Sequence, residues 1–216
     1  MNHLLIVGPS VRAAAFSALR AGLAPWCLDC FADRDLLAHA PTQRLVGPFP
    51  EALLPAFATL PLPTDTPWMI TGGLENHPDL LAELQRLRPN FWGNDAARVR
   101  RVRDRAWLDA ACRAVGLTMP TEGTWPPGPG RWLVKPERSA GGRGIRPWSD
   151  AEPAERPSGQ YVQAWQPGQP VGAIFVGLPE RTVLLGATQQ IVGLDWLGGT
   201  PFAYQGSVGP IVLPET

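Results

Sequence analysis

One short stretch, residues 131–148, holds the residue types and the spacing that could bind a phosphate. Residues 132–134 form an apolar run that predicts a β-strand, and Lys135 stands at its end. A loop of small residues follows, namely Ser139, Gly141, Gly142 and Gly144. Such a loop exposes successive backbone N–H groups to an anion, and a lysine adds a positive charge for phosphate oxygens. Because Ile145 resumes an apolar pattern, the stretch predicts a strand, a phosphate-binding loop and a second strand.

Lys135 differs in type from the other basic residues of the chain. The chain has eighteen arginines and a single lysine, which favours a position where a compact ammonium is needed instead of a planar guanidinium. The alternative is a hairpin with a glycine-rich turn and a chance lysine. A Walker A loop is disfavoured because no GK[ST] precedes a helix. The helix-opening dinucleotide pattern is disfavoured as well, because this loop leads into a strand.

Composition limits the classes of function. The 216 residues suffice for one or two domains, and 44% hydrophobic with 18% charged residues is usual for a globular protein. A formal net charge of zero provides no general attraction to nucleic acid. Apolar runs are too short for a membrane span, and the N-terminus lacks the pattern of a signal peptide. We therefore expect a cytoplasmic protein. The nine tryptophans suit either a core or a subunit interface, so an oligomer is possible.

The cysteines do not indicate a reactive or metal-binding site. There are three, and an odd number fits a reducing compartment without a disulfide framework. Cys27 and Cys30 form a C-x-x-C, but they lie at the end of an expected strand and not at a helix start. No second pair completes a zinc site. We interpret the cysteines as structural.

The first part of the chain predicts a parallel α/β unit. Residues 3–7 form an apolar strand, Ser10 is a plausible N-cap for a helix through Arg20, and residues 25–29 form a second strand. Short strands are also expected at Leu45–Val46 and at residues 68–70, the latter ending in Thr71-Gly72-Gly73-Leu74-Glu75-Asn76. Ligands of open α/β sheets collect beyond the carboxyl ends of strands, which makes Glu75 a candidate substrate residue. The other reading is an ordinary glycine turn before a helix.

The second part predicts a helical passage followed by antiparallel strands. Residues 95–115 are helical, with a break near Asn94 or Asp104. Strands are expected at residues 160–165, 171–177 and 182–192. The fold class is therefore α/β followed by α+β.

This order of elements, together with Lys135 and its glycine-rich loop, resembles the ATP-grasp enzymes. It is most similar to the carboxylate–amine ligase branch that includes tyramine–glutamate ligase of methanofuran synthesis. The resemblance implies a Rossmann-like pre-ATP-grasp domain over residues 1–94 and an incomplete ATP-grasp domain over residues 95–216. The implied function is that of an ATP-dependent ligase, which joins a small-molecule carboxylate to an amine through an acyl phosphate. The alternative is a non-catalytic nucleotide-binding protein or regulator, and a plain structural domain is a third reading.

The resemblance also implies roles for particular residues. Lys135 and the four loop residues would contact the phosphates of ATP. Arg105, with Arg103 as the alternative, lies where the family has its first phosphate-contacting lysine. The expected adenine linker is Gln163, Ala164 and Trp165. The expected acceptor-side loop contains Tyr204, Gly206, Ser207 and Gly209.

Two departures from the family pattern concern acidic residues. No Asp or Glu lies between Glu155 and Glu180, where the family has a ribose-binding glutamate. The family's Mg²⁺ ligands, an acid and an E-x-N-P-R-like run, are expected beyond Thr216. After Glu180 the only acids are Asp195 and Glu215. The resemblance therefore implies ATP and Mg²⁺ as cofactors, but no metal ligand and no catalytic residue is assignable within this chain, which by itself is not expected to catalyse.

Overall fold

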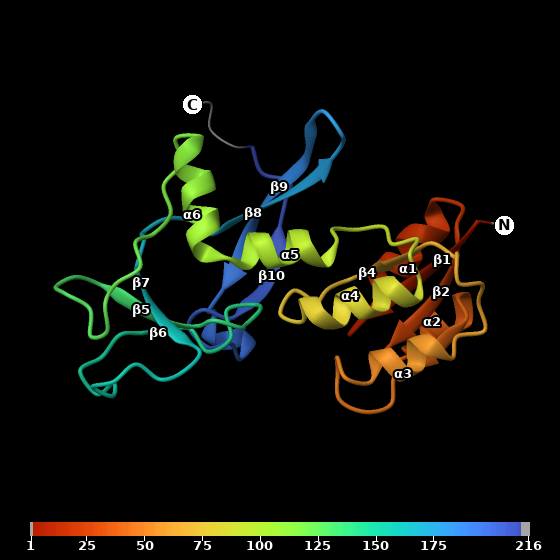
Figure 1. Cartoon of the computed structure of the whole chain (residues 1–216), viewed down its shortest axis with the longest axis horizontal. Coiled ribbons are helices and arrows are strands. Elements are labelled where there is room, and N and C mark those ends of the chain that lie inside the picture. Colours follow the sequence, from red (N-terminus) through yellow and green to blue (C-terminus); the bar gives the residue numbers. More distant parts are fainter. Residues whose placement is uncertain (1, 213–216) are drawn as a thin grey trace. The chain divides into compact units, whose positions relative to one another are not determined.

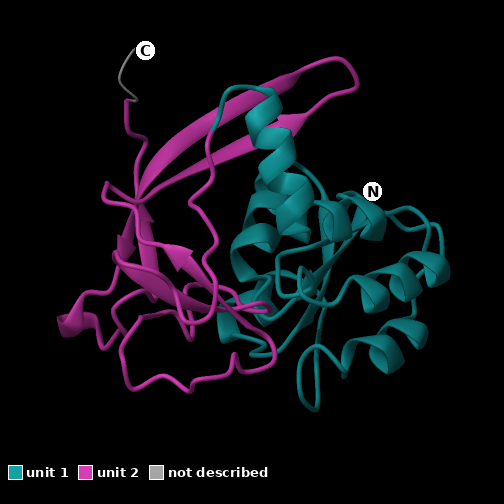
Figure 2. Ribbon diagram, turned by 60° about the vertical axis from the view of Figure 1, so that its left-hand side comes forward, with its two compact units in different colours: residues 1–117 teal, residues 118–216 magenta. Residues whose placement is uncertain are grey.

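The chain forms two compact units, residues 1–117 and 118–216 (Figure 2). The computed structural model describes residues 2–212. The first unit contains a parallel sheet with helices, and the second contains two antiparallel sheets (Figure 1). The predicted fold class, α/β followed by α+β, is confirmed.

The sheet of the first unit has the strand order β3-β2-β1-β4, with all neighbours parallel. Its strands are β1 (His3–Gly8), β2 (Ala24–Asp29), β3 (Thr42–Arg44) and β4 (Trp68–Ile70). The side chains of β1 alternate between two apolar clusters, since Leu4 and Ile6 belong to one and Leu5 and Val7 to the other. A strand that is buried on both faces needs an unbroken apolar run, which is why this segment was recognisable in the sequence.

Residues 2–117, the described part of the first unit, form six helices. They are α1 (Arg12–Arg20), α2 (Arg34–His39), α3 (Leu53–Ala58), α4 (Pro78–Leu87), α5 (Ala96–Arg103) and α6 (Arg105–Ala114). Leu81 and Leu84 of α4 are fully buried in the cluster that contains Leu5. Each such leucine contributes about 1.5–3 kcal/mol relative to an exposed one. The predicted break at Asp104 is confirmed, because its carboxylate accepts the N–H of Trp107 at 3.1 Å and so caps α6.

Arg88, the residue after α4, is a buried cation that is only 4% exposed. Its guanidinium donates to the carbonyl oxygens of Pro63 at 2.6 Å and Leu62 at 3.1 Å, and it lies over the ring of Phe57. Its own carbonyl oxygen accepts a bond from Nε1 of Trp68 at 2.6 Å. Burial lowers the pKa of Arg88. This residue therefore connects the segment before β4, β4 itself and the end of α4.

Two local expectations for the first unit were wrong. The third strand is Thr42–Arg44 and not Leu45–Val46, because β2 pairs with the earlier residues and leaves Val46 88% exposed. Ser10 does not cap α1. Instead the buried carboxylate of Asp29 accepts the N–H of Val11 at 2.7 Å. A side chain at the end of β2 thus satisfies the helix terminus that a local cap would have served.

The second unit contains two three-stranded sheets, with the orders β6-β5-β7 and β10-β9-β8. Their strands are β5 (Trp132–Pro136), β6 (Arg146–Pro147), β7 (Gln160–Ala164), β8 (Val171–Gly177), β9 (Thr182–Val192) and β10 (Tyr204–Val208), and a 3-10 helix, η1, spans Asp195–Leu197. The strands predicted at residues 160–165, 171–177 and 182–192 are confirmed. The buried apolar residues described in this unit lie mostly on β5 and β7; they are Leu133, Val134, Val162 and Ala187.

Candidate functional site

Lys135 lies near the end of β5 with a half-buried side chain. Its Nζ donates a hydrogen bond to Oε1 of Gln163 at 2.7 Å, and Nε2 of Gln163 donates to the carbonyl oxygen of Pro120 at 3.1 Å. The β5–β7 register explains the contact, since Lys135 pairs with Tyr161 and Gln163 is the next residue of β7 on the same face. Burial lowers the pKa of Lys135. The two polar residues that the sequence singled out separately are therefore direct neighbours.

The glycine-rich loop joins β5 to β6. Gly141, Gly142 and Gly144 have φ values of +61°, +74° and +75°, which only glycine adopts without strain. The hydroxyl of Ser139 donates to the carbonyl oxygen of Arg143 at 2.6 Å, which closes the loop on itself. The glycines thus meet a conformational requirement of this turn. The loop begins with Ser139, four residues after Lys135, and at its other end Gly144 lies against the ring of Pro136.

The expected adenine linker lies at the end of β7. The N–H of Ala164 donates to the carbonyl oxygen of Thr121 and that of Trp165 to the carbonyl oxygen of Arg131, both at 2.8 Å. These two amides are therefore engaged within the protein, and an adenine ring could use either one only by replacing its present partner. This detail was not accessible from the sequence.

An aromatic cavity of about 240 Å³ lies where β5 begins and where β6 and β7 end. It is lined by Gly130, Arg131, Trp132, Leu133, Pro147, Trp148, Trp165 and Phe202. The guanidinium of Arg131 lies 3.8 Å from the ring centroid of Trp165, a cation–π contact that orients the indole. Flat aromatic walls of this kind suit a planar heterocycle. Of the lining residues only Trp165 had been predicted as a site residue. Arg131, Trp148 and Phe202 carry no motif. The first two flank β5 and β6, and Phe202 comes from the segment before β10.

The residues expected in an acceptor-side loop form a strand instead. Tyr204, Gly206 and Ser207 lie on β10, which pairs with β9, and the hydroxyls of Tyr204 and Ser207 are 2.9 Å apart. The backbone N–H of Tyr204 donates to the carbonyl oxygen of Gly141 at 2.9 Å. The second unit thus brings one of these residues into contact with the glycine-rich loop.

Two predicted residues belong to the first unit. Glu75 lies in the turn between β4 and α4, at the carboxyl end of the parallel sheet. In the same segment the hydroxyl of Thr71 donates to the carbonyl oxygen of Ser10 at 3.0 Å. Arg105 is the first residue of α6 and is partly buried. Arg103, the alternative phosphate contact, donates to Oδ1 of Asn76.

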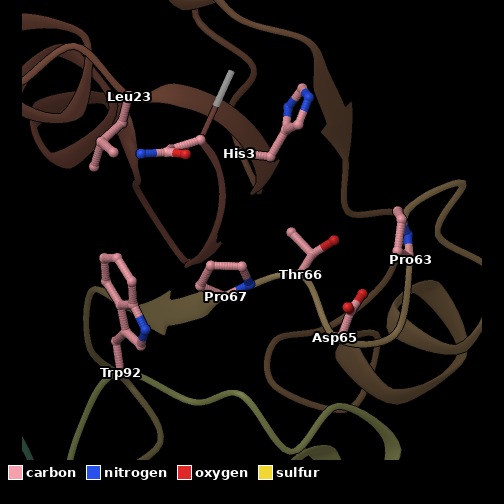
Figure 3. Close-up of a pocket in the computed structure, with 8 residues that line it drawn as sticks. His3, Leu23, Pro63, Asp65, Thr66, Pro67 and Trp92 are labelled. Carbon is pink, nitrogen blue, oxygen red and sulfur yellow. The ribbon is translucent and has the colours of Figure 1, made fainter.

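A second cavity, of about 430 Å³, lies at the opposite end of the parallel sheet (Figure 3). It is lined by Asn2, His3, Leu23, Pro63, Asp65, Thr66, Pro67 and Trp92. His3 begins β1, while Leu23 and Pro67 immediately precede β2 and β4. Ligands of open α/β sheets bind beyond the carboxyl ends of the strands, and this cavity is at the amino ends. It contains none of the predicted site residues.

The described residues do not form a metal site. Within residues 2–212 no group of three His, Cys, Asp or Glu side chains could hold a metal ion. Asp195 lies in η1, and Glu215 is outside the described residues. In the same part of the chain, no helix is both long and apolar enough to cross a membrane.

The pair Cys27 and Cys30 is unsuited to redox chemistry. Burial raises the pKa of Cys27 to about 11, against a weaker opposing effect of a hydrogen bond to Thr42, and the residue is fully buried. At pH 8 about one thiol in a thousand would be a thiolate. We expect iodoacetamide to label the partly exposed Cys112 well before Cys27, as measured by mass spectrometry with fragmentation to separate Cys27 from Cys30. Equal labelling rates for Cys27 and Cys112 would contradict the structural role.

Comparison with known proteins assigns the family. The sequence model of the ATP-grasp domain family matches residues 103–216, and the chain belongs to this family. Solved structures with a similar fold include N5-carboxyaminoimidazole ribonucleotide synthetase from Thermotoga maritima (TM-score 0.62, 10% identity, 88% of this chain and 53% of that one). The N5-carboxyaminoimidazole synthetase from Staphylococcus aureus, complexed with ADP, gives a TM-score of 0.61 at 14% identity, covering 88% of this chain and 55% of that one.

A third similar structure is L-amino acid ligase from Bacillus licheniformis (TM-score 0.60, 16% identity, 88% of this chain and 50% of that one). The chain thus spans about half the length of these three proteins. At such low identity the structural likeness concerns the fold alone. A sequence comparison with curated proteins gives no match.

Proposed function

We propose that this chain binds ATP as part of a carboxylate–amine ligase. The observation that carries the proposal is the arrangement around Lys135: a half-buried ammonium near the end of β5, followed in the β5–β6 loop by three glycines with positive φ. Both features lie inside the matched residues 103–216. An ammonium and a glycine-rich loop together suit the phosphate chain of a nucleotide.

The nucleotide would occupy the second unit as follows. Lys135 and the loop residues Ser139, Gly141, Gly142 and Gly144 contact the phosphates. The adenine binds beside Trp165, in or next to the aromatic cavity, where Gln163 and Ala164 end β7. A further positive charge for the phosphates, from Arg105, is proposed on the family resemblance alone. These roles follow from the chemistry of the side chains and from the family resemblance.

The reaction that fits this site has two steps. A carboxylate oxygen attacks the γ-phosphorus of ATP, and ADP leaves with the electrons of the broken P–O bond. An amine nitrogen then attacks the carbonyl carbon of the acyl phosphate, inorganic phosphate leaves, and the nitrogen loses a proton to give the amide. The chain's own cations would hold the phosphates in line, which is positioning and electrostatic catalysis. Glu75, Tyr204, Gly206 and Ser207 are the proposed contacts of the acid and the amine, and tyramine–glutamate chemistry is the proposed type.

A second candidate is a nucleotide-binding protein without ligase activity. It is favoured by one feature of the sequence: after Glu180 the acids are Asp195 and Glu215, and neither lies in an E-x-N-P-R-like run. Phosphoryl transfer by ATP-dependent enzymes commonly depends on Mg²⁺ to neutralise the transferred group. No step of the proposed reaction is therefore assigned to Mg²⁺ here.

Two further parts of the proposal are a cytoplasmic location and a domain boundary between residues 94 and 95.

Calorimetric titration with ATP, in the presence and absence of MgCl₂, tests both candidates. A coupled assay for ADP release, run over mixtures of amino acids and amines, then separates them. Binding together with substrate-dependent ADP release would support the ligase. Binding without ADP release under any mixture would support the non-catalytic protein. The absence of measurable ATP binding would contradict both.

A further inference from the structure

The glycine-rich loop is attached to a segment about sixty residues further along the chain. The carbonyl oxygen of Gly141 accepts the N–H of Tyr204 at 2.9 Å. Next to this bond, Gly142 packs directly on the backbone of Phe202. A Cβ atom built on Gly142 would lie 1.7 Å from the carbonyl oxygen of Phe202 and 2.7 Å from its carbonyl carbon. The loop between β5 and β6 thus rests on the turn that leads into β10.

Gly141 and Gly142 are glycines for different reasons. Both have positive φ, +61° and +74°, and share the strain that any other residue would meet there. A Cβ on Gly141 would meet no heavy atom within 4 Å, whereas a Cβ on Gly142 would collide with backbone atoms that cannot rotate away. Of these two positions, only Gly142 must be glycine because another segment of the chain is in contact with it.

The turn that contacts the loop, residues 200–205, is itself fixed by hydrogen bonds. The N–H of Gly193 donates to the carbonyl oxygen of Ala203 at 3.0 Å. The N–H of Ala203 donates to the carbonyl oxygen of Thr200 at 2.9 Å. The side chain of Gln205 bonds both backbone groups of Leu194, at 2.7 and 2.9 Å. These bonds tie residues 200–205 to the chain segment that follows β9. The turn can therefore act as a fixed support for the loop.

We propose that the turn before β10 is the positioning element of the phosphate-binding loop. The contact of Gly142 with Phe202 and the bond from Tyr204 to Gly141 hold the loop in one conformation without a nucleotide. A loop that is already ordered loses less conformational entropy when a ligand binds. The effect on ATP affinity rests on the proposed function, while the support of the loop does not.

Limited proteolysis of Gly142→Ala, with Gly141→Ala as the matched control, tests the support without any nucleotide. Trypsin can cleave after Arg138 and Arg143, which are exposed in the loop. Because cleavage of a native protein follows the population of the open form, we expect Gly142→Ala to be cut there about ten times faster than Gly141→Ala. Circular dichroism and the melting temperature verify that both variants fold. Equal cleavage rates would overturn the proposal.

Hydrogen exchange of the unchanged protein gives a test that does not depend on a variant. The Tyr204 amide should exchange slowly without ATP, because its N–H is donated to Gly141. Exchange at the rate of an unprotected amide would overturn the proposal. ATP affinity is measured separately: a larger loss for Gly142→Ala than for Gly141→Ala is expected. If the unchanged protein did not bind ATP at all, while cleavage and exchange behaved as expected, the proposed function would fail and the support would stand.

Discussion

Replacing Lys135 with alanine is expected to weaken ATP binding by about tenfold to a hundredfold, because a charge-assisted hydrogen bond contributes roughly 1.5–3 kcal/mol. In the unchanged protein this ammonium is half buried and bonded to Oε1 of Gln163. Isothermal titration calorimetry measures the change. Arg156→Ala is the matched control, because it removes one positive charge from an exposed position of the same unit. Equal dissociation constants for the two variants would remove Lys135 from the site.

The pH dependence of ATP binding gives a second readout of Lys135. Burial lowers the pKa of its ammonium below the ordinary value of 10.5, so the positive charge is lost at a lower pH than in a free lysine. ATP affinity should therefore fall as the pH rises through the alkaline range below 10.5. In Lys135→Arg this fall should disappear, because a guanidinium keeps its charge. A fall of the same size in Lys135→Arg would assign the titration to another group.

Replacing Arg88 with alanine is expected to lower the free energy of unfolding of the first unit by about 2–4 kcal/mol. The change removes the donor for the carbonyl oxygens of Pro63 and Leu62 and leaves a cavity beside Phe57. Urea denaturation followed by circular dichroism measures the loss. Arg86→Ala, at an exposed position of α4, should change the value by less than about 0.5 kcal/mol. A similarly small effect for Arg88→Ala would mean that water replaces its hydrogen bonds.

Local patterns in the sequence were enough to predict most strands and one helix boundary. The apolar run of β1 and the sequence pattern of β7 can be read from neighbouring residues alone. Asp104 caps α6 through a bond to Trp107, only three positions away. The glycine-rich loop was recognisable because positive φ requires glycine, and Lys135 because it is the single lysine. Such features need no knowledge of distant partners.

Features that depend on distant partners were missed or wrong. Asp29 caps α1 from the end of β2, which no local rule for Ser10 could indicate. The amides of Ala164 and Trp165 are engaged by the chain before β5. The aromatic cavity combines Arg131 with Phe202, residues that are 71 positions apart in the sequence. In each case a side chain or backbone group acts on a partner that only the tertiary fold brings near.

The bond between Tyr204 and Gly141 has a thermodynamic consequence. It joins the strand that carries the proposed acceptor-side residues to the loop that is proposed to hold phosphates. Any ligand of β10 that strengthened or broke this bond would change the affinity for ATP. By linkage, ATP would then change the affinity for that ligand by the same factor. In this protein the cooperativity between two substrates would thus depend on one backbone hydrogen bond.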